Sequence, residues 1–169
     1  RNVIMRVNGF SVDPRAKAKQ FKDKIFSNKI FSELDSLDMQ YKSFIGWRPK
    51  VVKMKYTNIE TPYNNRYSNG QSLFNSTWFF GGSTIWGFGS SDEGTIPSIY
   101  SKKKKSPVFN FGEQSWVSRQ SLNQYLSVLG DGYKPKLVIF YGGINDVSYG
   151  CRLENKNGPN HSRQEQISS

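Results

Sequence analysis

Three positions in this sequence combine a chemically useful group with the same local setting, an apolar run that ends in glycine. They are Ser83, Gly112 and Asn145. The apolar runs before them are residues 77–80, 107–111 and 137–141. A serine hydroxyl can attack an ester carbonyl, and suitably placed N–H groups can stabilise the oxyanion that develops. Together the three positions offer groups of the kind that acyl transfer uses, each at the end of an apolar run.

The three positions offer groups of the kinds that such chemistry needs. They are the Ser83 hydroxyl, the Gly112 backbone N–H and the Asn145 side-chain amide. A glycine lets a backbone amide approach a substrate closely, and a neutral amide donates at any ordinary pH. Taken singly, each position is more readily a turn residue, but the three in order favour the catalytic interpretation.

The segments between these positions predict the elements that must bring them together. Helices are expected over Thr95–Lys104, with Thr95 as N-cap and Ile96 and Ile99 facing inward, and over about residues 117–129, stopped by Gly130. Apolar strands that alternate with helices form right-handed βαβ units with a parallel sheet. The carboxyl ends of parallel strands share one edge of the sheet, where ligands bind in such folds. We therefore expect Ser83, Gly112 and Asn145 to lie at one edge.

The N-terminal part of the chain has a different pattern. Asp13-Pro14 has the form of a helix start, and apolar residues then recur with loosely helical spacing to about Tyr41. Beyond it, residues 42–76 are irregular, with one possible short strand at residues 51–56 and turns at residues 63–70. Residues 1–76 are thus expected to form a helical and irregular extension that packs on an α/β domain of residues 77–169.

The three glycine-flanked motifs resemble the sequence blocks of one enzyme family. Gly81-Gly82-Ser83-Thr84, Asn110-Phe111-Gly112 and Gly143-Ile144-Asn145-Asp146 resemble, in order, the first three blocks of the SGNH (GDSL-like) hydrolases. The resemblance covers Trp78 to Val147. The first block has Gly82 where the literal G-D-S-L signature has Asp. Phe44-Ile45-Gly46-Trp47-Arg48 also resembles the lead-in of envelope-associated members.

The resemblance implies a fold and a set of roles. The fold would be flavodoxin-like, a three-layer α/β/α arrangement with a parallel sheet, preceded by the N-terminal extension. The sequence offers three strands of the five that the family has, so the domain is expected to be incomplete at its C-terminus. The resemblance implies Ser83 as the nucleophile. The Ser83 N–H, the Gly112 N–H and the Asn145 side-chain amide would form the oxyanion hole, and Asp146 would hold the loop around Asn145.

The catalytic base is the main departure from the family. It would be a histidine preceded three residues earlier by aspartate, in a D-x-x-H block. The sequence has one histidine, His161, and Gly158 stands three residues before it. His161 lies in a Gly-Pro-Asn-His-Ser-Arg stretch that is typical of a surface loop. The sequence therefore predicts that the base is missing from this chain.

Two classes of function follow from these expectations. The first is a serine-dependent O-acyl ester hydrolase, of esterase or acetylesterase type, acting through an acyl-enzyme on an esterified carbohydrate or lipid. The related O-acyltransferase would share that intermediate. The second class is a non-catalytic SGNH-like module that binds a glycan or a protein. No cofactor is expected, and an extracytoplasmic or envelope location is favoured, with membrane association through a missing N-terminal segment.

Composition limits the other functions that could be considered. The formal net charge is +11, but the basic residues are scattered apart from Lys102–Lys105, and no nucleic-acid-binding motif accompanies them. We therefore expect no nucleic-acid partner. Cys151 is the single cysteine, so the sequence predicts neither a disulfide framework nor a metal site. No apolar run is long enough to span a bilayer.

Overall fold

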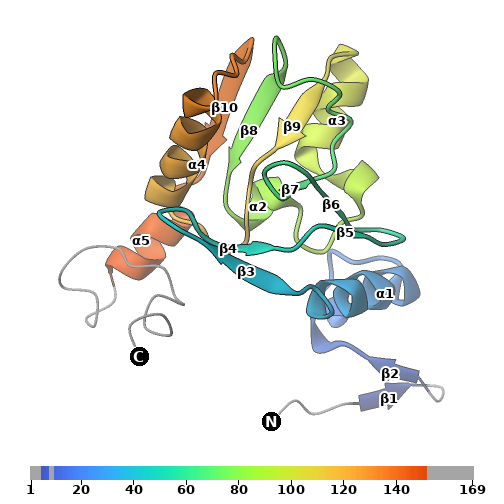
Figure 1. Cartoon of the computed structure of the whole chain (residues 1–169). Coiled ribbons are helices and arrows are strands. Elements are labelled where there is room, and N and C mark those ends of the chain that lie inside the picture. The colour runs from blue at the N-terminus through green and yellow to red at the C-terminus, as the bar shows by residue number, and fades with distance from the viewer. Residues whose placement is uncertain (1–4, 8–9, 152–169) are drawn as a thin grey trace.

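The computed structural model describes residues 5–7 and 10–151, with side chains described for residues 13–149 and 151. Its strands are β1 (Met5–Val7), β2 (Phe10–Val12), β3 (Met39–Lys42), β4 (Gly46–Pro49), β5 (Val52–Lys53), β6 (Asn58–Glu60), β7 (Asn65–Arg66), β8 (Thr77–Gly81), β9 (Val108–Asn110) and β10 (Leu137–Tyr141). Its α-helices are α1 (Lys24–Asp35), α2 (Ser83–Trp86), α3 (Ile96–Lys104), α4 (Ser118–Gly130) and α5 (Ile144–Gly150). Two short 3-10 turns, η1 (Pro14–Lys17) and η2 (Asp92–Gly94), complete the described elements (Figure 1).

A six-stranded mixed sheet forms the centre of the molecule, in the order β10-β8-β9-β7-β6-β5. Strands β10, β8 and β9 run parallel, with Leu137 opposite Thr77 and Trp78 opposite Phe109. Strands β7, β6 and β5 are antiparallel to their neighbours. Two separate hairpins, β1-β2 and β3-β4, lie outside this sheet.

The expected flavodoxin-like fold, a three-layer α/β/α arrangement with a parallel sheet, is therefore wrong, because the sheet is mixed. Strands β5, β6 and β7 come from the segment expected to be irregular, yet they extend the sheet beyond β9. The connections from β5 to β6 and from β6 to β7 are only a few residues long. They are too short for the crossover that a parallel pair requires, so these strands pair antiparallel. Residues 52–66 and 77–141 thus contribute to one sheet.

The three predicted parallel strands are confirmed, and helices cover both faces of this half of the sheet. Side chains of α4 pack with alternate residues of β8 and β9 in one cluster that contains Trp78, Phe80 and Val128. On the other face, α2 and α3 contribute Ile85 and Tyr100 to a cluster around Phe79. Figure 1 shows α3 and α4 on opposite sides of these strands.

The predicted helix start at Thr95 is confirmed, but the inward face of that helix is not as expected. Thr95 Oγ1 accepts a hydrogen bond from the Ser98 N–H. Ile96 and Ile99 are exposed, and the buried positions are Pro97, Ser98 and Ser101. The side chains of Ser98 and Ser101 are small, so α3 packs closely on β9. The spacing of the apolar residues therefore predicted the wrong buried face for this helix. None of the helices within the described ranges is long and apolar enough to cross a lipid bilayer.

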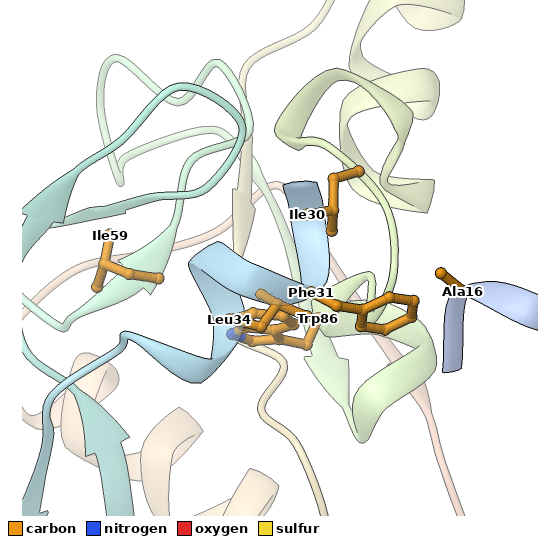
Figure 2. Close-up of a cluster of buried hydrophobic side chains, with 6 residues drawn as sticks. All are labelled: Ala16, Ile30, Phe31, Leu34, Ile59 and Trp86. Carbon is orange, nitrogen blue, oxygen red and sulfur yellow. The ribbon is translucent and has the colours of Figure 1, made fainter. Parts of the chain in front are cut away.

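The N-terminal helix packs against the short helix that follows β8. Asp13 caps η1 as its sequence suggested, and α1 then supplies Phe31 and Leu34 to a buried cluster with Trp86 of α2 (Figure 2). Ile59 of β6 belongs to the same cluster, which therefore also contacts the sheet. Residues far apart in the chain thereby fix the turn that carries Ser83.

Candidate functional site

The carboxyl ends of β8, β9 and β10 place the three candidate positions at one end of the parallel strands. Strand β8 ends at Gly81, and Ser83 opens α2 after one further glycine. Gly112 follows β9 by two residues, and Asn145 lies in the first turn of α5 after β10. In-register parallel pairing brings these ends together.

Asn145 lies directly against the residue that precedes the serine. A Cβ atom added at Gly82 would lie 2.8 Å from Asn145 Nδ2, which is closer than side chains pack. Asn145 Nδ2 donates to the Trp116 carbonyl oxygen at 2.8 Å. An amide nitrogen carries two hydrogens, so this bond uses one of them. Ser83 and Asn145 are both half-buried. The structure therefore places Asn145 against Gly82, the residue that precedes Ser83.

Gly112 lies at the expected strand end, but its N–H already has a hydrogen-bond partner inside the protein. It is buried, and its N–H donates to Asn110 Oδ1 at 3.1 Å. A Cβ atom at this residue would lie 2.7 Å from the Trp86 backbone nitrogen. The glycine thus permits close contact between the loop after β9 and α2. Its N–H could reach an oxyanion only by giving up or sharing the bond to Asn110.

Asp146, in the first turn of α5, connects this helix to the start of α4. Its carboxylate accepts hydrogen bonds from the Ser118 N–H at 2.9 and 3.1 Å and from the Ser118 hydroxyl at 3.0 Å. A carboxylate at the first turn of a helix satisfies N–H groups that have no partner within the helix. Asp146 therefore helps to set where Asn145 lies relative to Trp116.

Asn110 is a buried polar residue whose importance the sequence did not reveal. Its Nδ2 donates to the Ile85 carbonyl oxygen at 2.9 Å, while its Oδ1 accepts from Gly112. One side chain thus links the end of β9 to the helix that begins at Ser83. The available signal was its polar type at the end of a fully apolar strand.

Arg66 holds the far end of the serine-bearing turn. It is buried, pairs with Asp92 at 2.9 Å, and donates to the carbonyl oxygens of Trp86, Gly87 and Ser90 at 3.0, 2.7 and 2.6 Å. Its guanidinium also lies 4.4 Å from the centre of the Trp86 ring. Burial lowers the pKa of Arg66 and raises that of Asp92, and the attraction between the two charges opposes both shifts.

Arg48 fixes the loop after β9 in a comparable way. Its guanidinium is fully buried and donates to the carbonyl oxygens of Phe111 at 3.2 Å and Asn64 at 2.7 Å. Burial lowers the pKa of Arg48, and the Glu113 carboxylate, 4.0 Å from its Nε, opposes that shift. The Phe111–Gly112 peptide is therefore held on both sides, its carbonyl by Arg48 and its N–H by Asn110.

The described residues contain no histidine, and His161 lies outside them. Within the same part of the chain, no group of three or more His, Cys, Asp or Glu side chains could hold a metal ion. A small cavity of about 30 Å³ lies beside Gly82, bounded also by Phe80, Trp116 and Phe140. The site geometry thus offers a hydroxyl, an amide and a small apolar space.

The three motifs thus follow one another along the chain and meet at one end of the parallel strands. No protein-family model matches the chain, and no curated protein was found to match it.

Proposed function

We propose that this chain carries the nucleophile and part of the oxyanion hole of a serine-dependent O-acyl ester hydrolase. One observation carries the proposal: Asn145 lies against Gly82, next to Ser83, at the carboxyl ends of parallel strands. Local turn chemistry does not require two such groups from distant segments to meet. A nucleophile beside a preorganised donor is what acyl transfer needs.

The proposed reaction proceeds through an acyl-enzyme. Ser83 Oγ attacks the ester carbonyl carbon, and the Ser83 N–H and the second amide hydrogen of Asn145 stabilise the oxyanion. The carbon–oxygen bond to the alcohol then breaks, and water releases the acyl group in a second step. The serine proton must pass to a general base, for which a histidine is the usual choice. Transfer to a sugar hydroxyl in place of water would make the protein an O-acyltransferase.

The small cavity beside Gly82 supports a short acyl group. Its volume is only about 30 Å³, and Phe80, Trp116 and Phe140 are among the residues that bound it. So small a space favours the smallest common acyl group, acetyl. We therefore infer that acetyl esters are preferred over butyryl or longer esters.

The test is turnover of 4-nitrophenyl acetate by the native protein and its variants. Ser83→Ala should reduce the rate to background. Asn145→Ala should lower kcat by about 10²–10³-fold, or about 3–4 kcal/mol, with a much smaller change in KM. Asn123→Ala is the matched control, because Asn123 also donates to a backbone carbonyl, that of Phe44, but on α4. Full activity in a folded Ser83→Ala protein would refute the hydrolase.

A non-catalytic binding module is the second candidate, and one observation favours it. The Gly112 N–H is committed to Asn110, so one of the three expected oxyanion donors is engaged inside the protein. This candidate predicts no Ser83-dependent turnover, together with retained binding of a glycan or protein. The same assay therefore distinguishes it from the enzyme.

A further inference from the structure

A hollow of about 380 Å³ borders the two loops that carry Ser83 and Gly112. Phe88 lines it and donates its N–H to the Ser83 carbonyl oxygen at 3.0 Å. Ser115 also lines it and directly precedes Trp116, whose carbonyl oxygen holds Asn145. A volume of this size lies within the range of small-ligand sites, about 300–1,000 Å³. The hollow therefore adjoins the proposed site.

The hollow is lined by both apolar and hydrogen-bonding side chains. Half-buried Trp47 and exposed Phe88 supply aromatic rings, while Gln114 and Ser115 supply neutral polar groups. Aromatic faces pack against the C–H face of a sugar ring, and amides and hydroxyls bond its hydroxyl groups. A lipid chain would require apolar walls throughout, which this lining does not offer.

The charged residues of the hollow are paired with one another. Arg15 forms ion pairs with Asp13 and Asp35, and of these two carboxylates Asp35 lines the hollow beside Arg15. These bonds raise the pKa of Arg15, and the bond from Arg15 lowers the pKa of Asp13. One cation thus faces two carboxylates, so no positive charge is left over. An acidic sugar would find no uncompensated cation here, so the lining disfavours an anionic ligand.

We propose that this hollow binds the sugar ring of an uncharged, O-acylated saccharide, with Trp47 and Phe88 as its apolar platform. The assignment of the saccharide as the alcohol part of the substrate rests on the proposed esterase function. Trp47, Arg15 and Asp35 come from the N-terminal part of the chain. That part would then determine which ester reaches Ser83, in addition to supporting the fold.

The test is equilibrium binding to the full 169-residue chain carrying Ser83→Ala, so that hydrolysis does not intervene. The probes are methyl 6-O-acetyl-glucoside, whose ring keeps free hydroxyl groups, and, as an ester without a sugar ring, glyceryl triacetate. Binding is measured by ligand-observed NMR and tryptophan fluorescence. We expect saturable binding of the glucoside ester and weaker binding of glyceryl triacetate.

Variants locate the binding on the molecule. Trp47→Ala should weaken binding of the glucoside ester about 2–12-fold, from the loss of one ring contact, and Trp47→Phe should restore most of it. Gln114→Ala should weaken it about 2–10-fold. Phe74→Ala is the matched control, because Phe74 is an exposed ring in a second hollow, of about 1140 Å³, lined by segments that precede β8 and β10. It should leave binding unchanged.

The outcomes separate this inference from the proposed enzyme. Equal affinity for both probes, or sensitivity to Phe74→Ala with indifference to Trp47→Ala, would overturn the sugar site. If binding depends on Trp47 but the native protein shows no Ser83-dependent hydrolysis of 4-nitrophenyl acetate, the sugar site stands and the esterase fails. If hydrolysis depends on Ser83 but no binding depends on Trp47, the esterase stands and the sugar site fails.

Discussion

The two sides of the parallel strands differ in how completely the protein covers them. Every residue of β8 and β9 is buried. Strand β10 lies at the edge of the sheet, and Leu137, Phe140 and Tyr141 are exposed on it. The helix that follows, α5, also exposes Ile144 and Val147. The same sheet thus joins a fully packed region to an apolar edge that the described residues leave open.

The polar contacts that hold the candidate site follow the same division. Buried Arg66, Asn110 and Arg48 fix the turn with Ser83 and the loop with Gly112. Asn145 arrives from the edge, where its side chain donates to the Trp116 carbonyl oxygen. Ser83 is therefore positioned by the core, while the position of Asn145 depends on its contact with the loop before α4. The predictions below test this contrast, from the largest expected effect to the smallest.

The largest effect is expected at Arg66, in the packed region. Arg66→Ala would leave Asp92 buried without its cation and would release three carbonyl groups at the end of α2. Breaking a buried pair in this way costs about 3–5 kcal/mol in the free energy of unfolding. Urea denaturation should show this loss, whereas exposed Arg119→Ala should change little. A cost below about 1 kcal/mol would mean that Arg66 does not hold the turn.

Phe80 and Phe140 offer a direct comparison between the two regions. Their rings stack at 5.1 Å, but Phe80 is 0% exposed and Phe140 is 50% exposed. Phe80→Ala should cost about 3–5 kcal/mol, because it leaves a cavity in the core. Phe140→Ala should cost about 1–2 kcal/mol, since much of its ring is already in water. Equal losses in urea denaturation would remove the distinction between core and edge.

The parallel strands, packed and edge alike, are where the sequence was most informative. Apolar runs with glycine stops predicted β8, β9 and β10, and Thr95 predicted the start of α3. These signals are local: a strand's apolar run and a helix cap each depend on a few neighbouring residues. The expected positions of Ser83 and Asn145 followed from the parallel pairing of those strands.

The antiparallel half could not be predicted in the same way. Asn65 and Arg66 were expected in a turn, yet they form β7 and are buried. A two-residue polar strand has no periodicity, and Arg66 is buried because it meets Asp92, 26 residues later. The engagement of the Gly112 N–H was equally hidden, since the sequence does not show which way the Asn110 side chain turns.

Two glycines at the site should respond differently to an added methyl group. In Gly112→Ala the Cβ would meet the Trp86 backbone nitrogen at 2.7 Å, which can move only with α2. Overpacking of this kind costs about 1–3 kcal/mol. In Gly82→Ala the Cβ would meet the Asn145 amide, which can turn away at the cost of its bond to Trp116, about 1 kcal/mol. Thermal denaturation of the two variants measures the difference. A larger loss from Gly82→Ala would show that Asn145 is held as firmly as the core.

The smallest effect is expected on α5, where Ile144 and Val147 are 74% and 63% exposed. Ile144→Ser and Val147→Ser should each change the free energy of unfolding of this chain by no more than about 0.5 kcal/mol. Ile85→Ser is the matched control, because Ile85 is buried between β8 and α2 and should cost several times more. Contiguous exposed apolar side chains commonly mark a surface that another part or partner covers. Urea denaturation of the three variants measures these changes. A loss above about 1 kcal/mol at Ile144 or Val147 would show that these side chains are covered in the folded protein.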